Sequence, residues 1–221
     1  MLSVAVLALG CGLLTNQELL EAIVQVESGG NAHALNVNGG VQLVRQPRSR
    51  EEAVAMARWL ERHGYSFDVG LAQLNSANLA RLGLDVASAF EPCANLRAAS
   101  RVLEECLYRA RARLGDGARA LTAAVSCYNT GHFTRGVANG YVAAVRSRAP
   151  KSLSLRSHDA LRAIATDSDR AGRCANEERS GSRGVPSSGR FGRTARRNDA
   201  FARRLADAFG VARAANQEGV P

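Results

Sequence analysis

The sequence has almost no lysine and few aromatic residues. Of its 29 basic residues only Lys151 is a lysine, and aromatic residues make up 5% of the 221 residues. The chain carries neither a basic surface pattern interleaved with aromatics nor a nucleic-acid recognition motif, so its positive charge does not by itself predict specific nucleic-acid binding. No Gly-rich phosphate loop occurs either, which leaves nucleotide hydrolysis without support.

Long apolar runs and spaced metal ligands are also missing. Residues 1–14 are apolar but lack a basic start and are too short to span a bilayer, so we expect either an apolar arm packed on the core or a weak secretion signal. The five cysteines form no Cys-x-x-Cys pair, and no metal site is expected. Two disulfides could form in an oxidising compartment, but Cys106 and Cys127 also suit a reduced, buried role, and the pairing stays open.

The rest of the composition is that of a soluble globular chain. Hydrophobic residues make up 46% and charged residues 22%, and the length suits one domain of about 150 residues with an extension. The net charge of +9 favours anionic partners, which include nucleic acid, anionic lipid and cell-wall polymers. Residues 150–221 are rich in Ser, Gly and Arg around 180–193, a composition typical of a flexible extension, with an amphipathic helix predicted over 195–209.

Helical periodicity and end signals predict a mainly α (α+β) domain over residues 15–149. The expected helices, each bounded by capping residues or glycine, cover residues 15–28, 49–63, 95–114, 118–128 and 140–148. An Asn-Gly turn within residues 36–44 predicts a small β-hairpin, and residues 65–69 should be extended. The predicted fold is therefore a helical domain with a small hairpin, followed by a basic, partly disordered C-terminal extension over 150–221.

One acidic residue falls on the apolar side of the first predicted helix. Leu19, Ile23 and Glu27 are spaced by four residues and therefore share one face. Burial disfavours the charged carboxylate and raises its pKa, which a general acid working near neutral pH requires. The alternative is that Glu27 lies in the last turn, where the apolar stripe ends and the side chain reaches solvent.

Four separated segments carry further motifs. They are residues 22–30 (AIVQVESGG) with 34–39 (ALNVNG), residues 68–75 (DVGLAQLN), residues 126–131 (SCYNTG) and residues 140–142 (GYV). In order and spacing they resemble the VirB1-like lytic transglycosylases, cell-wall enzymes of type IV secretion systems in the goose-type lysozyme-like superfamily. The resemblance covers roughly residues 15–148. Its one departure is Ala72, where methionine is usual in the family.

The resemblance implies a lysozyme-like fold and a peptidoglycan lytic transglycosylase that needs no cofactor and no metal. Glu27 would protonate the β-1,4 bond between N-acetylmuramic acid and N-acetylglucosamine. It would then accept the proton of the muramyl 6-hydroxyl as the 1,6-anhydro ring closes. Hydrolytic glycosidases generally use two carboxylates. Asp68 is the nearest second candidate, but its place before a Val-Gly pair favours a turn or capping role.

The resemblance also implies substrate-binding residues in the first two motifs. Ser28 is expected to position the substrate, or to cap the helix end. Gly70 would let the backbone approach the sugar closely. Gln73 and Asn75 would hydrogen-bond to its acetamido and hydroxyl groups, although both could equally be ordinary loop residues.

Three further substrate-binding candidates lie in the last two motifs. Tyr128 offers a flat apolar face to a sugar ring, whereas Asn129 could simply stop the helix before Gly131. Tyr141 is similar to the family tyrosine whose hydroxyl contacts the catalytic glutamate, although it could also be a core tyrosine.

The partners implied are the glycan strands of peptidoglycan and components of a type IV secretion system, in the periplasm. Contact with the membrane surface would be peripheral, and no specific nucleic acid is expected. Three alternatives stay open. One is a non-catalytic peptidoglycan-binding assembly module, one a hydrolytic muramidase, and one nucleic-acid binding through the basic extension.

Overall fold

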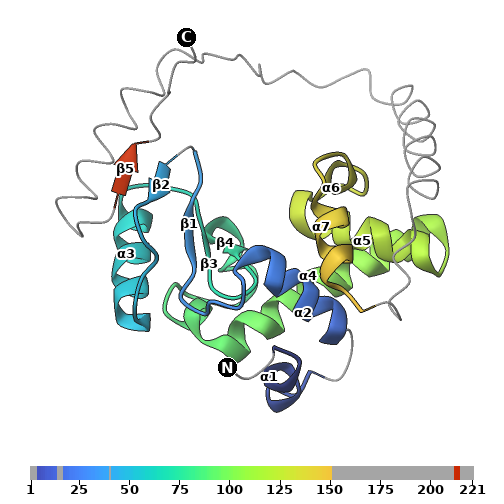
Figure 1. Ribbon diagram of the computed structural model, residues 1–221, viewed down its shortest axis with the longest axis horizontal. Coiled ribbons are helices and arrows are strands. Elements are labelled where there is room, and N and C mark those ends of the chain that lie inside the picture. The colour runs from blue at the N-terminus through green and yellow to red at the C-terminus, as the bar shows by residue number, and fades with distance from the viewer. Residues whose placement is uncertain (1–3, 14–16, 40, 151–211, 215–221) are drawn as a thin grey trace, which may run out of the picture. The chain divides into compact units, whose positions relative to one another are not determined.

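The computed structural model describes residues 4–13, 17–39, 41–150 and 212–214 (Figure 1). The chain divides into two compact units. The first, called the helical unit, contains the described residues up to 26 and from 97 to 150. The second, called the sheet unit, contains residues 27–96 and 212–214 of the described chain.

The helical unit is made of α-helices, most of which bury apolar side chains in one shared core. They are α1 (Val4–Gly10), α2 (Gln17–Glu27, all but its last residue), the greater part of α4 (Pro92–Leu114), α5 (Ala118–Thr130), α6 (Arg135–Ala138) and α7 (Tyr141–Arg148). Leu19 and Ile23 of α2 are buried in this core, and so is the predicted stripe of α4 from Leu103 to Ala110. The periodicity that predicted α2 and α4 is therefore confirmed.

A disulfide between Cys106 and Cys127 joins α4 to α5 within the helical unit, with 5.8 Å between the two Cα atoms. This resolves the choice left open by the sequence, because both residues are buried, as expected, and they are bonded rather than reduced. Cys11 and Cys93 are disulfide-bonded as well. The bond between Cys106 and Cys127 therefore fastens the two longest helices of the unit to each other.

The sheet unit contains a three-stranded antiparallel sheet and one long helix. Its elements are β1 (Leu35–Val37), β2 (Val41–Leu43), α3 (Arg50–Arg62), β3 (Phe67–Val69), β4 (Leu74–Asn75), the 3-10 helices η1 (Ser76–Asn78) and η2 (Ser88–Phe90), the first turn of α4, and β5 (Ala212–Ala214). The strand order in the main sheet is β1-β3-β4 (Figure 1). A second, two-stranded ladder joins β2 to β5.

The predicted hairpin over residues 36–44 is wrong in its pairing. Both of its strands exist, but β1 pairs with β3 and β2 pairs with β5. The register sets Leu35 opposite Val69 and Val37 opposite Phe67, and all four side chains are buried. A lone two-stranded ribbon cannot bury such a face, so the pairing that forms the larger sheet is favoured. The small hairpin of this fold is instead β3–β4.

Hydrogen bonds at the start of α3 confirm the predicted cap and add an ion pair. Ser49 accepts a hydrogen bond from the backbone N–H of Glu52. The Glu52 carboxylate in turn accepts from the Arg45 guanidinium at 2.7 Å and from the Arg48 backbone N–H at 2.7 Å. These two donors, with Arg45 the larger cause, lower the pKa of Glu52 to about 2. The segment entering α3 is therefore held by a paired carboxylate.

Several predictions fall at the chain ends. Residues 1–14 contain α1, whose Ala8 is buried. The capping box at Thr15, the flexible extension and the helix over 195–209 lie outside the described residues. Among the residues that the structure describes, no helix is both long enough and apolar enough to cross a membrane.

Candidate active site

Glu27 is the last residue of α2, and the residue after it is fastened to the β3–β4 loop. The Ser28 hydroxyl donates to the backbone oxygen of Leu71 at 2.7 Å and accepts from the Gly30 N–H at 3.2 Å. Glu27 itself is half-buried, which is intermediate between the buried and the solvent-exposed carboxyl that the sequence left open. The raised pKa expected of it stays a prediction. The bond from Ser28 nevertheless fixes the helix end that carries the carboxyl to the second motif.

The buried side chain of Asn95 holds that second motif in place. Its Nδ2 donates to the backbone oxygens of Val69 (3.1 Å) and Ala89 (2.8 Å), and its Oδ1 accepts from the Ala72 N–H (2.9 Å). The sequence predicted that α4 begins at about Asn95, but the helix begins at Pro92 and Asn95 lies within its first turn. Sequence reasoning missed this residue, because an Asn near a helix start is usually a cap.

Gly70 is required by this arrangement. Its φ is +76°, and an added Cβ would lie 2.4 Å from Nδ2 of Asn95 and 2.9 Å from the backbone oxygen of Ala89. Its own N–H donates to the backbone oxygen of Ala34 at 2.8 Å. The structure thus gives Gly70 a packing role, and the close approach to a sugar stays a prediction.

Gln73 has a left-handed backbone, with φ of +48°, the one positive φ of a non-glycine residue among the described residues. Its Nε2 donates to the backbone oxygens of Gly70 (2.9 Å) and Ala34 (3.2 Å). Both amide N–H groups are thereby engaged, while Oε1 accepts from none of the described residues. A half-buried, oriented amide oxygen of this kind can accept a hydrogen bond from a ligand N–H or O–H.

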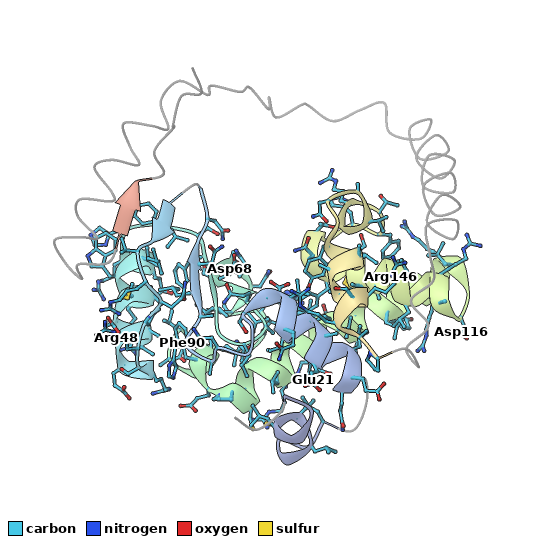
Figure 2. The ribbon with its side chains drawn as sticks, viewed as in Figure 1. Glu21, Arg48, Asp68, Phe90, Asp116 and Arg146 are labelled. Atoms are coloured by element: carbon cyan, nitrogen blue, oxygen red, sulfur yellow. A yellow bond between two sulfur atoms is a disulfide. The ribbon has the colours of Figure 1, made fainter. Side chains whose placement is uncertain are left out.

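The extended segment predicted over residues 65–69 is confirmed by the central strand β3, and because Asp68 lies in this strand, the turn role favoured for it is wrong (Figure 2). The register sets it between Asn36 of β1 and Asn75 of β4. Asn75 donates to its Oδ1 at 2.7 Å, and Asn36 to its Oδ2 at 3.4 Å. Since side chains alternate along a strand, these three polar residues share the face of the sheet opposite its buried apolar side chains. The result is a carboxylate held between two amides.

Asn75 has a structural role beyond this pair. Its Oδ1 accepts from the Ala77 N–H at 3.1 Å and so caps η1, and its Nδ2 also donates to the Ser66 hydroxyl at 3.2 Å. All the polar atoms of its side chain are therefore used within the sheet unit. Its expected contact with substrate stays a prediction.

In the helical unit, the third and fourth motifs meet at the end of α5. The Asn129 Oδ1 accepts from Nδ2 of Asn139 at 3.0 Å, and the Asn139 Oδ1 accepts from the N–H of Tyr141 at 3.0 Å. Gly131, with φ of +74°, closes the helix, so Asn129 is not the stop that one interpretation proposed. Tyr128 is half-buried against the core.

Tyr141 begins α7 and is 8% exposed, which agrees with the core alternative for this residue. Its contact with Glu27 stays a prediction.

The structure thus groups the predicted residues in two sets. Glu27, Ser28, Gly70, Gln73 and Asn75 belong to the sheet unit, and the remaining three to the helical unit. Among the described residues, no group of three or more His, Cys, Asp or Glu could hold a metal ion. A reaction free of metal and cofactor remains the expectation from the sequence.

Comparison with known proteins gives this arrangement a family. The family described as "Transglycosylase SLT domain" matches residues 12–149. The "Type IV secretion system protein virB1" of Brucella abortus biovar 1 (strain 9-941) is 47% identical over 132 residues, which are 59% of this chain and 55% of that protein. The "Protein virB1" of Agrobacterium fabrum (strain C58 / ATCC 33970) is 41% identical over 131 residues, 59% of this chain and 52% of that protein.

A third relative, "Protein virB1" of Rhizobium radiobacter, is 40% identical over 131 residues, covering 59% of this chain and 54% of its own length. The chain thus spans about half the length of the curated relatives it matches. No solved structure matches it. The family match covers more than half of the chain and includes all four motifs. The chain therefore belongs to the transglycosylase SLT domain family, as a VirB1-like member.

Proposed function

We propose that this protein is a peptidoglycan lytic transglycosylase that cleaves the β-1,4 bond between N-acetylmuramic acid and N-acetylglucosamine, with Glu27 as its catalytic residue. The observation that carries the proposal is the family match over residues 12–149, which contains Glu27 at the end of α2. The hydrogen bond from Ser28 to Leu71 supports it, since it fixes the end of that helix to the motif loop. Such fixation holds a catalytic group near its working geometry.

The reaction needs one carboxyl group that changes its protonation state twice. Protonated Glu27 gives its proton to the glycosidic oxygen as the bond to C1 of the muramyl sugar breaks, and N-acetylglucosamine leaves with a free hydroxyl. The 6-hydroxyl oxygen of the same muramyl sugar then forms a bond to C1. Glu27, now a carboxylate, accepts the hydroxyl proton and is ready for the next cycle. Atoms balance without water, and the product carries a 1,6-anhydro ring.

Gln73 is suited to orient the sugar for this ring closure. Its Nε2 is tied to the backbone of Gly70 and Ala34, so its Oε1 has a fixed direction. We assign to Oε1 the hydrogen bond from the acetamido N–H of a bound sugar. The left-handed backbone at this residue stores about 1–3 kcal/mol, a strain that is common where a side chain has a functional orientation.

The names of the relatives support a place in type IV secretion. We propose that cleavage opens the wall locally for assembly of such an apparatus, and that the protein acts in the periplasm. Two observations agree with this compartment. A disulfide joins Cys106 to Cys127, and the net charge of +9 would attract anionic wall polymers.

Digestion of purified sacculi tests the chemistry. Mass spectrometry of the released fragments should show 1,6-anhydromuramyl ends. Glu27→Gln should retain glycan binding and lose cleavage. Glu21→Gln is the matched control, because it removes a carboxylate from the same helix and should leave cleavage intact (Figure 2). Full cleavage by Glu27→Gln would rule out this residue as the acid.

A hydrolytic muramidase is the second candidate, and one observation favours it. Asp68 supplies a second carboxylate in the same unit as Glu27, held by Asn36 and Asn75 in a polar environment. Hydrolases use such a pair. Reducing muramyl ends that disappear in Asp68→Asn would establish hydrolysis, whereas anhydro ends that persist in this variant would exclude it. Binding without any released fragment would indicate a non-catalytic module.

A further inference from the structure

A cavity of about 420 Å³ lies in the helical unit, between the C-terminal half of α4 and the segment that follows α5. Its volume is within the range of small-molecule binding sites. The residues that give it chemical character are Tyr108, Arg109, Arg113, His132, Phe133 and Thr134. None of them belongs to the proposed catalytic machinery.

Two arginines, Arg109 and Arg113, supply positive charge to this cavity. Arg109 and Arg113 are four residues apart on α4 and therefore share a face. In the part of the chain that the structure describes, neither guanidinium pairs with a carboxylate. Arg111, between them, forms an ion pair with Asp116 at 2.9 Å. The two guanidinium charges, which have no carboxylate partner among the described residues, favour an anionic ligand.

The walls of the cavity are also aromatic. Tyr108 is 77% exposed, an unusual state for a large hydrophobic side chain, and Phe133 packs partly against the core with Arg113 over its ring at 5.8 Å. Flat apolar surface beside cations suits an organic anion with a carbon skeleton better than a bare inorganic ion. An Arg guanidinium can bind a carboxylate, as it can a phosphate, through two parallel hydrogen bonds.

The cavity is held by the disulfide between α4 and α5. Cys106 lies one turn before Arg109, and Cys127 one turn before Gly131, whose N–H donates to the Cys127 backbone oxygen at 2.7 Å. The Arg109 guanidinium lies against the Cys127 sulfur at 2.9 Å. Both walls are therefore set before a ligand arrives, which lowers the entropic cost of binding.

We propose that this cavity binds a carboxylate of the short acidic peptides that peptidoglycan strands carry on their muramyl sugars. The inference rests on the proposed function, because it assigns a second subsite for the same substrate. Asn129 and Tyr128, which are expected to contact the sugar, directly precede the cavity segment. His132 lies three residues after Asn129, which is at most about 11 Å of extended chain. A strand bound at the end of α5 would bring its peptide within reach of Arg113.

Calorimetric titration of the full chain with the free tetrapeptide stem (L-alanyl-γ-D-glutamyl-meso-diaminopimelyl-D-alanine) tests the binding. The double variant Arg109→Gln/Arg113→Gln should weaken it by about tenfold or more. Arg113→Gln alone, which leaves the contact of Arg109 with the disulfide intact, should weaken it in the same direction. Arg111→Gln is the matched control, since it removes the same charge from the same helix outside the cavity.

Three results would overturn the proposal. The first is equal weakening by Arg111→Gln, which would mean a general effect of charge. The second is undiminished binding of a tetrapeptide with amidated carboxyl groups. The third is inorganic phosphate displacing the peptide at equal concentration, because the cavity would then be an anion site without preference for the peptide.

Kinetics on two substrates separates this inference from the proposed function. On intact sacculi the double variant should raise KM by about tenfold with kcat unchanged, and on glycan strands stripped of peptide by an amidase it should match the wild type. Equal KM values of the double variant and the wild type on intact sacculi would refute the peptide subsite but not the proposed transglycosylase activity. If the wild type cleaved neither substrate, the proposed function would be refuted. The calorimetric titration would still test whether the cavity binds the peptide.

Discussion

Replacing Gly70 by Ala should destabilise the sheet unit by far more than the same change at another left-handed glycine. The added Cβ would meet Nδ2 of Asn95 at 2.4 Å and the backbone oxygen of Ala89 at 2.9 Å, so the Asn95 side chain must move. Its movement would remove hydrogen bonds to the buried oxygens of Val69 and Ala89, each worth about 1–3 kcal/mol when left unsatisfied. With about 1 kcal/mol for the left-handed backbone, the expected loss is about 3–7 kcal/mol.

The matched control for this prediction is Gly64→Ala. Gly64 has nearly the same φ, +72°, but an added Cβ there meets no atom within 4 Å. It should therefore lose only the backbone term of about 1 kcal/mol. Urea unfolding of the two variants, followed by circular dichroism, gives the difference. Equal losses of stability in the two variants would refute the reasoning, because the clash with Asn95 would then add nothing to the cost of the left-handed backbone.

Three further changes test single contacts. Gln73→Glu removes the two N–H donors to Gly70 and Ala34 and should lower the free energy of unfolding by about 2 kcal/mol near neutral pH. This loss should shrink when acid protonates the new carboxyl group. The control Gln25→Glu, at an exposed position, should show neither effect in urea unfolding. The pKa of Glu52 is lowered from 4.5 to about 2, so its carboxylate stabilises the fold above its ordinary pKa and loses this contribution as pH falls through about 2. Glu52→Gln should therefore flatten the pH dependence of the free energy of unfolding in this acid range. An unchanged pH dependence would contradict the pairing with Arg45. Cys106→Ala/Cys127→Ala removes a cross-link between residues 21 apart and should lower the free energy of unfolding by about 3 kcal/mol, measured by thermal unfolding without reductant. Unchanged stability would show that the bond does not stabilise the fold.

Most helices of this fold could be predicted from the sequence because their signals are local. Ser49 caps α3 and Gly131 ends α5, each through contacts within a few residues. The stripe from Leu103 to Ala110 needs only the helical period. Short elements such as α6, with four residues, carry no such period and were missed.

The strand pairing and the disulfide could not be predicted in the same way because both are contacts between distant residues. Alternation marks β1 as a strand, but its partner β3 begins 30 residues after β1 ends, and nothing within residues 36–44 distinguishes that partner from β2. The position of Asp68 depended on this pairing, and the turn expected there was therefore wrong. The spacing of cysteines likewise leaves many pairings open.

The candidate site shows that a motif can be held by a residue outside it. Asn95 belongs to none of the four motifs, yet its side chain binds the backbone at Val69 and Ala72, on both sides of Gly70. Gly70 is in turn one of the two acceptors that orient Gln73. The direction of the Gln73 amide oxygen therefore depends on a buried contact with α4, made before any sugar binds. A site organised in this way adds little ordering cost to ligand binding, as the sugar-orienting role proposed for Gln73 requires.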